Sequence, residues 1–405
     1  MIVRYRYRAY PDAAQAQMLA RTFGCARVVF NDALRVREEA RAAGEKISGS
    51  EVQRRAVTLA ECAPEREWLG EVASAALVQA CQDARRAYRN WFDSLSGKRK
   101  GRRVGHPRFR SRKDRRPSVR LTRNGFSQHG DKLYVPKVGD IRVRWSRPLP
   151  SVPSSVTVIR EADGRYYASF VVQVPVTPLP ATSADVGLDL GLSVLAATSD
   201  GSLIANPRHL RARARRLARA QRAQRALCRK KKGSASRSKA RVRVAVQHRK
   251  VRAARADYLH KTALRLIRDN QAVYVEDLAV SGLARTRLAK SVHDAGWATL
   301  VRLLEEKAES HGRIVVKVGR WFPSSQVCSA CGANDGPKPL HVRTWSCAAC
   351  GALHDRDVNA ARNILTEGRK VAAGLAETQN ACEGQVRPGA IPAPARETGT
   401  RRSAA

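Results

Sequence analysis

Residues 328–364 read CSACGANDGPKPLHVRTWSCAACGALHDRDVNAARNI, and this stretch decides how the rest of the chain is interpreted. Four cysteines follow the spacing C-x2-C-x15-C-x2-C, with a glycine after each pair: Cys328, Cys331, Cys347 and Cys350. Such knuckles turn backbone N–H groups toward the thiolates and bring both pairs to one tetrahedral ion. The spacing predicts one zinc ion. Because four thiolates leave no open position for a substrate, this zinc is expected to be structural.

The alternative for these cysteines is disulfide bonding. The other five cysteines show no framework spacing: Cys25, Cys62, Cys81, Cys228 and Cys382. The chain starts MIVRYRYRAYPD, which alternates arginine with apolar residues like a strand and does not resemble a signal peptide. Because disulfides belong to oxidising compartments, zinc is favoured.

The charge of the chain predicts its partner. Lysine and arginine number 76 against 35 aspartates and glutamates, which gives a formal net charge of +41 on 405 residues. A chain so charged repels itself unless a polyanion neutralises it, so we expect a nucleic acid. A membrane-surface protein would show an amphipathic anchor, and the sequence contains none; no apolar run is long enough to span a bilayer. We therefore expect a cytoplasmic protein with no membrane partner.

The pattern of the first half predicts a strand, a helical segment and a group of short strands. Residues 3–10 alternate like a strand, and residues 13–95 carry apolar residues at helical spacing. Residues 96–116 are basic and rich in glycine and proline, and residues 119–174 form short alternating runs separated by turns. Because a lone strand needs a sheet, we expect the first strand to join a small β-barrel into which the helical segment is inserted.

The first catalytic candidate is Asp189, in the run DVGLDLGLSV. Side chains of a strand alternate, so Gly187, Asp189 and Gly191 share one face. Two glycines beside a carboxylate leave room for a metal ion and a phosphodiester. The alternative is a turn or capping aspartate, which the position inside an apolar strand disfavours.

Two further carboxylates follow. Glu276 ends the strand-like run QAVYVEDL, where it is expected beside Asp189 while Asp277 points away. Asp357 opens a helix, and its alternative role is that of an N-cap. A strand aspartate, a strand-end glutamate and a helix-start aspartate are what a ribonuclease-H-like fold needs to hold two Mg2+ ions on one phosphate. His354 is interpreted either as tuning this site or as a packing residue of the ribbon.

Residues 208–261 are dense in arginine and alanine and are interrupted by KKKGSAS at residues 230–236, which predicts two helices joined by a flexible turn. They are interpreted as a solvated basic hairpin, as a surface that binds along a nucleic-acid backbone, or as both.

The motifs VGLDLG around Asp189, VEDL around Glu276, and CSACG and CAACG followed by DRDVNAARNI around Asp357 resemble those of the TnpB family. This family comprises transposon-encoded RNA-guided nucleases related to the single-effector type V CRISPR enzymes. RYRAYPD, VGHPRFRSRKD and PKVGDIRVRWSRPLP also match its pattern. The resemblance extends over the chain as far as about Gly368.

The resemblance implies an α/β multidomain protein in which Asp189, Glu276 and Asp357 bind the catalytic metal ions. Its expected parts are a wedge β-barrel (1–12 and 117–180), an inserted helical recognition domain with a basic loop (13–116), a ribonuclease-H-like RuvC nuclease domain (181–320 and 354–367), an inserted four-cysteine zinc ribbon (321–353) and a disordered tail (368–405).

The function so implied is an RNA-guided DNA endonuclease that cleaves double-stranded target DNA beside a short flanking motif. Its expected cofactors are two Mg2+ and one Zn2+, and its expected RNA is a guide from the transposon end, with one protein copy per RNA. Arg108, Arg110 and Arg112 in the basic loop are expected to contact nucleic acid. Two alternatives, an RNA-guided DNA-binding repressor without cleavage and a basic zinc-ribbon RNA-binding protein, are disfavoured by the three intact carboxylates.

Overall fold

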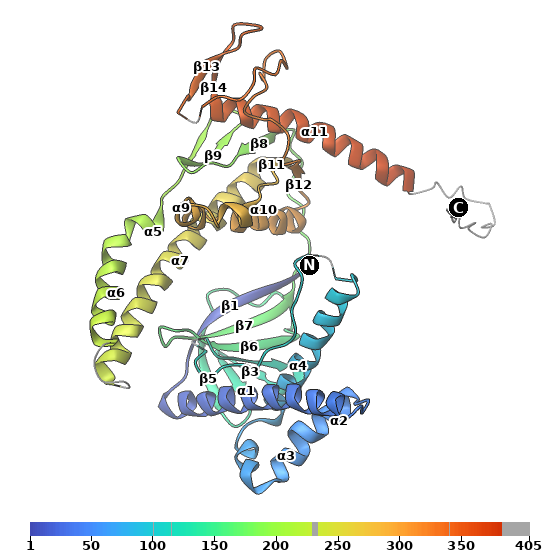
Figure 1. The fold of residues 1–405 in the computed structure, drawn as a ribbon, viewed down its shortest axis with the longest axis vertical. Coiled ribbons are helices and arrows are strands. Elements are labelled where there is room, and N and C mark those ends of the chain that lie inside the picture. Colours follow the sequence, from blue (N-terminus) through green and yellow to red (C-terminus); the bar gives the residue numbers. More distant parts are fainter. Residues whose placement is uncertain (100, 115, 229–233, 340, 383–405) are drawn as a thin grey trace, which may run out of the picture. The chain divides into compact units, whose positions relative to one another are not determined.

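The computed structural model describes residues 1–99, 101–114, 116–228, 234–339 and 341–382, with side chains described as far as residue 374 (Figure 1). It divides into two compact units. The first unit contains Met1–Pro178, His209–Tyr258 and Glu309–Gly312. The second contains Leu179–Arg208, Leu259–Ala308 and the described residues from Arg313 on.

The first unit is built on an antiparallel sheet with strand order β2-β6-β7-β1-β5-β4-β3. Its strands are β1 (Ile2–Tyr10), β2 (Ser118–Thr122), β3 (Ser127–His129), β4 (Lys132–Val135), β5 (Gly139–Arg144), β6 (Ser155–Arg160) and β7 (Tyr166–Gln173). The first strand lies between β7 and β5, and it brings Tyr7 into the core against Phe170. Within the described residues no pairing of β2 with β3 closes this sheet, so the predicted barrel is an open sheet, and a helix packs against the edge at β2.

Helices occupy the segment between β1 and β2. They are α1 (Ala13–Ala42), α2 (Gly49–Gln53), a π-helical turn (Arg54–Thr58), α3 (Leu59–Cys62), a 3-10 turn (Pro64–Glu71) and α4 (Ser74–Leu95), of which α4 covers β2. Pro11 ends β1, and Asp12 begins α1 by accepting a hydrogen bond from the backbone N–H of Gln15 at 2.8 Å. The side chain of Gln15 accepts the N–H of Asp12 in return, which completes a capping box.

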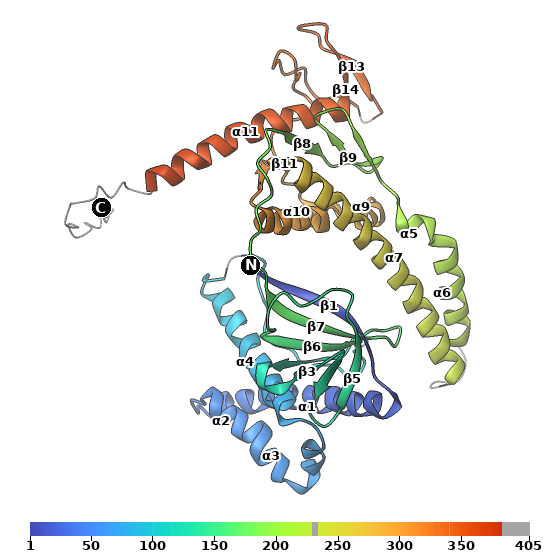
Figure 2. The ribbon, with the colours of Figure 1, turned by 180° about the vertical axis from the view of Figure 1, so that it is seen from behind.

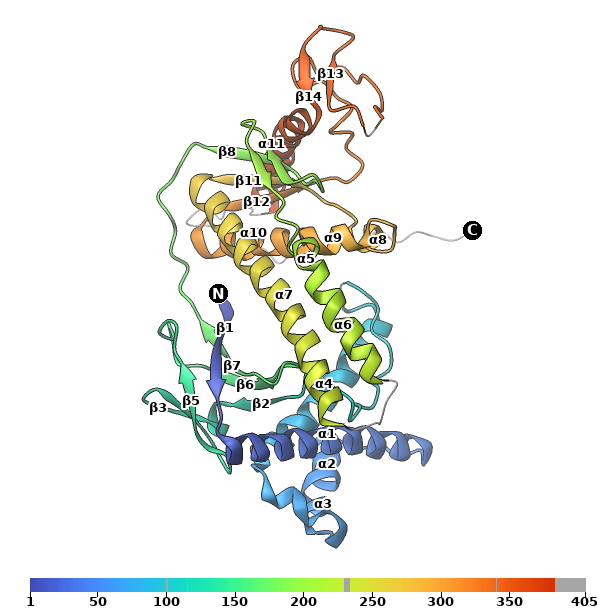
Figure 3. The same cartoon turned by 90° about the vertical axis from the view of Figure 1, so that its left-hand side faces the viewer.

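A helical hairpin also belongs to the first unit. It consists of α5 (His209–Ala212), α6 (Ala214–Cys228) and the part of α7 (Ala235–Asp269) before Leu259, and Figure 3 shows α6 and α7 side by side. The predicted turn at residues 230–236 lies mostly outside the described residues. The larger part of this hairpin packs with the first unit, although its residues fall within the segment 181–320 expected for the nuclease domain.

Buried carboxylates explain that packing. Asp163, in the turn between β6 and β7, has a side chain only 1% exposed and accepts a hydrogen bond from Arg249 of α7 at 2.6 Å. Glu161, in the same turn, contacts Arg6 at 2.6 Å and Arg252 of α7 at 3.3 Å. Burying a carboxylate is costly unless it is paired, so these contacts tie α7 to the β6–β7 turn.

The second unit contains a mixed sheet with strand order β10-β9-β8-β11-β12. Its strands are β8 (Asp185–Asp189), β9 (Val194–Thr198), β10 (Leu203–Ala205), β11 (Ala272–Glu276) and β12 (Ile314–Val318). Strands β8, β11 and β12 are parallel to one another, whereas β9 and β10 are antiparallel to their neighbours. The three parallel strands therefore end at the same edge of the sheet.

Helices cover both faces of this sheet. Helix α11 (Arg356–Cys382) crosses one face, and α10 (Trp297–His311) lies on the other, as Figures 1 and 2 show. Two short helices, α8 (Val280–Leu283) and α9 (Ala289–Ala295), connect β11 to α10. No described helix is long and apolar enough to span a membrane.

Helix α11 lies unusually close to the sheet because of two glycines. A Cβ at Gly187 of β8 would come within 2.1 Å of the carbonyl oxygen of Ala361, and one at Gly368 would come within 2.3 Å of the ring of Tyr274. The space beside Gly187 is thus filled by α11, which corrects the expectation that it admits a metal ion and substrate. The glycine serves the packing of the helix that carries Asp357.

Helix α11 also corrects the predicted start of the tail. It continues through Gly368 to Cys382, whereas the sequence predicts a disordered tail from residue 368. Val371 and Ala372 pack against the apolar cluster that includes Tyr274 and Ile364, so this segment has a hydrophobic face to bury. The rest of the predicted tail, residues 383–405, lies outside the described residues.

Substituting Gly187 should destabilise the second unit. Gly187→Ala is expected to lower its free energy of unfolding by about 1–3 kcal/mol, because the new methyl group would collide with the backbone of α11. Gly282→Ala in α8 is the matched control, since a Cβ there meets nothing within 4 Å and the change should stay within about 0.5 kcal/mol. Urea denaturation followed by circular dichroism measures both, and equal effects of the two variants would contradict this packing role.

Candidate active site and zinc ribbon

Two of the three predicted carboxylates stand at the ends of neighbouring strands. Strands β8 and β11 pair in parallel with Leu188 opposite Val275, so Asp189 and Glu276 follow at the same edge. Asp189 lies two residues after Gly187, and Glu276 two residues after Tyr274, both of which face α11. Side chains two apart in a strand share a face. Both carboxylates therefore stand on the side of the sheet covered by α11.

The third carboxylate, Asp357, lies in the first turn of α11. Asp355 caps this helix, because its Oδ1 accepts the backbone N–H groups of Asp357 at 3.0 Å and Val358 at 2.9 Å. The alternative role of Asp357 as an N-cap is thus filled by Asp355. The side chain of Asp357 instead accepts hydrogen bonds from Arg343 at 3.1 and 3.2 Å. Asp357 precedes Ala361 by one helical turn, and Ala361 lies directly over Gly187 of β8.

These carboxylates are close enough to influence one another's ionisation. Burial and the negative charges of Asp357 and Glu276 raise the pKa of Asp189 to about 7, although nearby arginines oppose the shift. Burial, and then the neighbouring Asp277, also raises the pKa of Glu276. A cation bound beside Asp189 would favour its ionised form by offsetting the neighbouring negative charges. The oxygen donors fit a hard divalent cation such as Mg2+.

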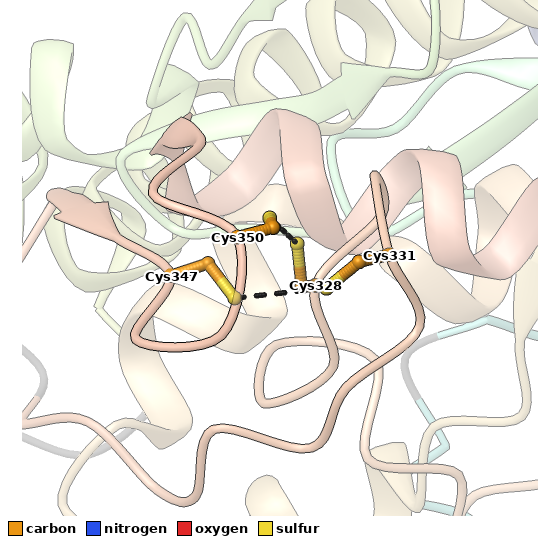
Figure 4. A group of neighbouring side chains, drawn as sticks. All are labelled: Cys328, Cys331, Cys347 and Cys350. Carbon is orange, nitrogen blue, oxygen red and sulfur yellow. Dashed lines mark hydrogen bonds between the residues drawn. The ribbon is translucent and has the colours of Figure 1, made fainter.

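The four cysteines converge as the spacing predicts (Figure 4). The Sγ atoms of Cys328 and Cys350 are 3.7 Å apart, and those of Cys331 and Cys347 are 3.8 Å apart. Sulfur atoms bound to one tetrahedral zinc at about 2.3 Å would be about 3.8 Å apart. The cluster thus has the dimensions of a zinc site, and no described cysteine forms a disulfide.

The surroundings of Cys328 favour its thiolate form. Burial raises the pKa of this thiol, but hydrogen bonds from the backbone of Cys331 and Ala330 and from His354 outweigh that effect and lower the pKa to about 6. The Nε2 atom of His354 lies 3.0 Å from the Sγ atom of Cys328, and its ring packs against Trp345. His354 is therefore a buried packing residue in contact with one of the four cysteines, as one of its two interpretations proposed.

Two asparagines of α11 hold the first knuckle in place. Asn359 is 1% exposed; its side chain accepts the backbone N–H of Ser329 and donates to the carbonyl of Val327, both at 2.8 Å. Asn363, one turn later, donates to the carbonyls of Val327 at 2.6 Å and Ser324 at 2.8 Å. The peptides on both sides of Cys328 are thereby fastened to the helix that carries Asp357.

Sequence reasoning did not find Arg343, Asn359 or Asn363. Arg343 immediately precedes β13 (Thr344–Ser346), which pairs with β14 (Leu353–Asp355) and so returns the chain to the start of α11. Nothing in the local sequence of Arg343 marks it as a partner of Asp357. The string DVNAARN does place both asparagines on one helical face with spacing i, i+4, a signal that was available.

The three predicted nucleic-acid contacts lie in the first unit. Arg108 and Arg112 are exposed. Arg110 is engaged within the protein, because its guanidinium lies 3.7 Å from the ring centroid of Phe30 and 3.6 Å from Asp83. Asn31 also hydrogen-bonds the backbone N–H of Arg110 at 2.7 Å. Arg110 therefore braces the basic loop against α1 and α4 although its side chain is still 40% exposed, and Arg108 and Arg112 are exposed as well.

Taken together, the structure is a mixed α/β fold with three acidic residues at the ends of β8 and β11 and the start of α11, and with a four-cysteine cluster. Three family models match it: "Helix-turn-helix domain" (HTH_OrfB_IS605) over residues 1–46, "Probable transposase" (OrfB_IS605) over residues 169–287, and "Cas12f1-like, TNB domain" over residues 297–364. A solved Cas12f1–sgRNA–target DNA complex has a similar fold, with a TM-score of 0.55 over 86% of this chain and 82% of the other at 14% identity.

Curated relatives agree with these matches. The chain is 44% identical to a "Putative RNA-guided DNA endonuclease" of Streptomyces pristinaespiralis, over 95% of this chain and 92% of the relative. It is 30% identical to the protein named "Putative RNA-guided DNA endonuclease InsQ" in Escherichia coli K12, over 91% and 93% of the two chains. The chain belongs to this family, the transposon-encoded TnpB proteins, which confirms the resemblance stated from its motifs.

The raised pKa of Asp189 makes stability depend on pH. The unfolded carboxyl ionises near its ordinary pKa of 3.8, but the folded one ionises only near 7, so the metal-free second unit should lose stability as the pH rises between these values. Asp189→Asn should therefore match the wild type near pH 4 and melt higher at pH 8, by about 2–4 °C per kcal/mol of relieved repulsion. Melting scans in EDTA test this. A difference that did not grow with pH would contradict the coupling.

Removing the side chain of Asn359 should weaken the attachment of the first cysteine knuckle to α11 without removing the zinc ion. Asn359→Ala leaves the N–H of Ser329 and the carbonyl of Val327 without their partner and should cost about 1–3 kcal/mol of stability, while one zinc per chain is retained. Asn334→Ala is the control, because that residue is exposed and its side chain accepts a hydrogen bond from the N–H of Gly336 in its own loop, while its backbone bridge to Val327 does not depend on the side chain. Zinc assays and melting temperatures compare the two variants. Equal melting temperatures for Asn359→Ala and Asn334→Ala would contradict the role of Asn359 in holding the knuckle against α11.

Proposed function

We propose that this protein is an RNA-guided DNA endonuclease of a transposable element, and that it cleaves by metal-dependent phosphodiester hydrolysis. The observation that carries this proposal is the placement of Asp189 and Glu276 at the ends of neighbouring parallel strands, with Asp357 in the first turn of the helix that packs on β8 and near enough to raise the pKa of Asp189. Family membership supports the RNA-guided activity, since the relatives are named for it.

The proposed assignment of the second unit is a RuvC nuclease domain with the ribonuclease-H-like fold. The sheet order β10-β9-β8-β11-β12, with three parallel strands and two antiparallel ones, supports it. The zinc ribbon is inserted between β12 and α11. The first unit is assigned as a wedge sheet with an inserted helical recognition domain, since α1 to α4 lie between β1 and β2 in the chain.

Asp189, Glu276 and Asp357 would hold two Mg2+ ions through their oxygens. When bound, the ions would stabilise negative charge on the attacking and leaving oxygens of the phosphodiester. The protein supplies a fixed geometry, because two of the ligands stand on rigid strands and the third on a helix packed directly against them. Arg343 holds the carboxylate of Asp357 and balances part of the local negative charge.

The proposed partners are a guide RNA from the transposon end and double-stranded target DNA carrying a short flanking motif, with one protein copy per RNA. The net charge of +41 supports a polyanion bound in the resting state. Such a complex would reside in the prokaryotic cytoplasm. Exposed Arg108 and Arg112 remain proposed contacts to nucleic acid.

The test begins with the protein purified together with its RNA, which is sequenced to define the guide. A plasmid carrying the matching target and a library of flanking sequences should then be cut in Mg2+ and left intact in EDTA. Asp189→Ala, Glu276→Gln and Asp357→Ala should each abolish cutting while retaining RNA and target binding. Glu306→Gln is the matched control, because this exposed carboxylate on α10 pairs with Arg302 at the surface.

Two outcomes would contradict the proposal. Cleavage of a chosen target by protein freed of RNA would indicate a DNA endonuclease that reads its site directly. Tight RNA-directed binding of target without any cutting by the wild type would indicate the RNA-guided repressor instead.

A further inference from the structure

The most exposed large apolar side chain of the described residues stands at the edge of the sheet that carries Asp189 and Glu276. Trp321 is 90% exposed, whereas Trp297 and Trp345 of the same unit are 5% and 6% exposed. A single exposed apolar residue is ordinary on a protein surface. The position of this indole and the way its backbone is held distinguish it from an incidental one.

A tight turn fixes the backbone of Trp321. The N–H of Phe322 donates to the carbonyl of Gly319 at 3.0 Å, which places Arg320 and Trp321 at the two corners. Phe322 packs inward against the apolar cluster that includes Val318 and Tyr274. Because neighbouring residues are anchored inward and Pro323 follows, the turn presents the indole to solvent on a held backbone.

The same turn lies next to Glu276. Strand β12 pairs with β11 in parallel with Val318 opposite Glu276, and the N–H of Asp277 donates to the carbonyl of Val318 at 3.0 Å. The guanidinium of Arg320 forms an ion pair with the carboxylate of Asp277. Two residues separate Val318 from Trp321, so the Cα atoms of Val318 and Trp321 lie within about 11 Å of one another. That reach corresponds to a neighbouring nucleotide of a strand bound at Glu276.

A cavity borders both Arg320 of the turn and Glu276. It has a volume of about 320 Å3 and is also lined by Leu278 and by Trp297 of α10, so it lies on the α10 side of the strand ends. The turn and the end of β11 therefore adjoin the same open space.

We propose that Trp321 is a stacking platform for a base of single-stranded DNA entering the nuclease site. Aromatic side chains bind unpaired bases through their π-faces regardless of sequence, which suits an enzyme whose sequence recognition is delegated to a guide RNA. DNA is chosen over RNA because the platform adjoins the cluster proposed to cut DNA. This inference rests on the proposed function and assigns a substrate contact outside the metal-binding carboxylates.

The first experiment measures cutting. The protein–RNA complex carrying Trp321→Ala, Trp321→Phe or the control Trp68→Ala is assayed on a matched target and on a single-stranded DNA oligonucleotide. Trp68 is an indole of the first unit that is 39% exposed and bonded to the carbonyl of Glu65. Trp321→Ala should raise the KM for the oligonucleotide by about 5- to 150-fold with kcat changed less, while Trp321→Phe should restore most of the loss. Melting temperature, zinc content and bound RNA should stay at wild-type values.

The second experiment identifies the stacked strand independently of cleavage. Complexes inactivated by Asp189→Ala are irradiated with target DNA in which the strands carry 5-iododeoxyuridine, or with guide RNA carrying 5-iodouridine, and the cross-linked peptide is identified by mass spectrometry. Cross-linking of DNA to the Trp321 peptide is expected. Cross-linking of the Trp321 peptide only to RNA would contradict the proposed stacking of Trp321 on DNA. A wild-type KM for Trp321→Ala in a complex that cuts normally would contradict it as well. Failure of the wild-type complex to cut would overturn the proposed function.

Discussion

The second unit depends on the close contact between α11 and β8, which exists because residue 187 has no side chain. Ala361 of the helix lies where a Cβ of residue 187 would be, and the pairing of Gly368 with the ring of Tyr274 repeats this arrangement further along the helix. A larger residue at either position would lift the helix from the sheet. Asp357 lies one turn before Ala361, so the same contact sets its distance from the strand carboxylates Asp189 and Glu276.

Bringing those carboxylates together has an electrostatic cost that the protein only partly offsets. Arg343 pairs with Asp357, yet the pKa of Asp189 remains raised to about 7 by burial and by its acidic neighbours. The surrounding chain has the opposite problem, since its net charge of +41 is concentrated in arginines and lysines that repel one another. A divalent cation would relieve the repulsion among the carboxylates, and a bound polyanion would relieve the repulsion among the arginines and lysines. A metal ion and a nucleic acid are the two partners that a metal-dependent nuclease binds.

The sequence correctly predicted the features that depend on residues close together in the chain. The four cysteines converge because their spacing encodes two knuckles, and the position of β1, β8 and β11 followed from alternation. Features that depend on contacts distant in sequence were missed or misassigned. The helical hairpin packs with the first unit because Asp163 is neutralised by Arg249, which lies 86 residues away, and Arg343 meets Asp357 only through the fold of the ribbon. The helical extent of residues 368–382 was hidden by a composition that is typical of disorder.

The ribbon itself is best understood as a brace for α11. His354 contacts Cys328 and is followed by the N-cap Asp355, while Asn359 and Asn363 grip the peptides on both sides of the same cysteine. The first knuckle is thus attached to the helix on both sides of Asp357. Because a helix start frays unless its end groups are held, these contacts fix the first turn of α11 from outside the sheet. Zinc bound by the four cysteines would stabilise the ribbon. It would then influence the candidate active site through the position of one helix terminus, without contacting any reacting atom.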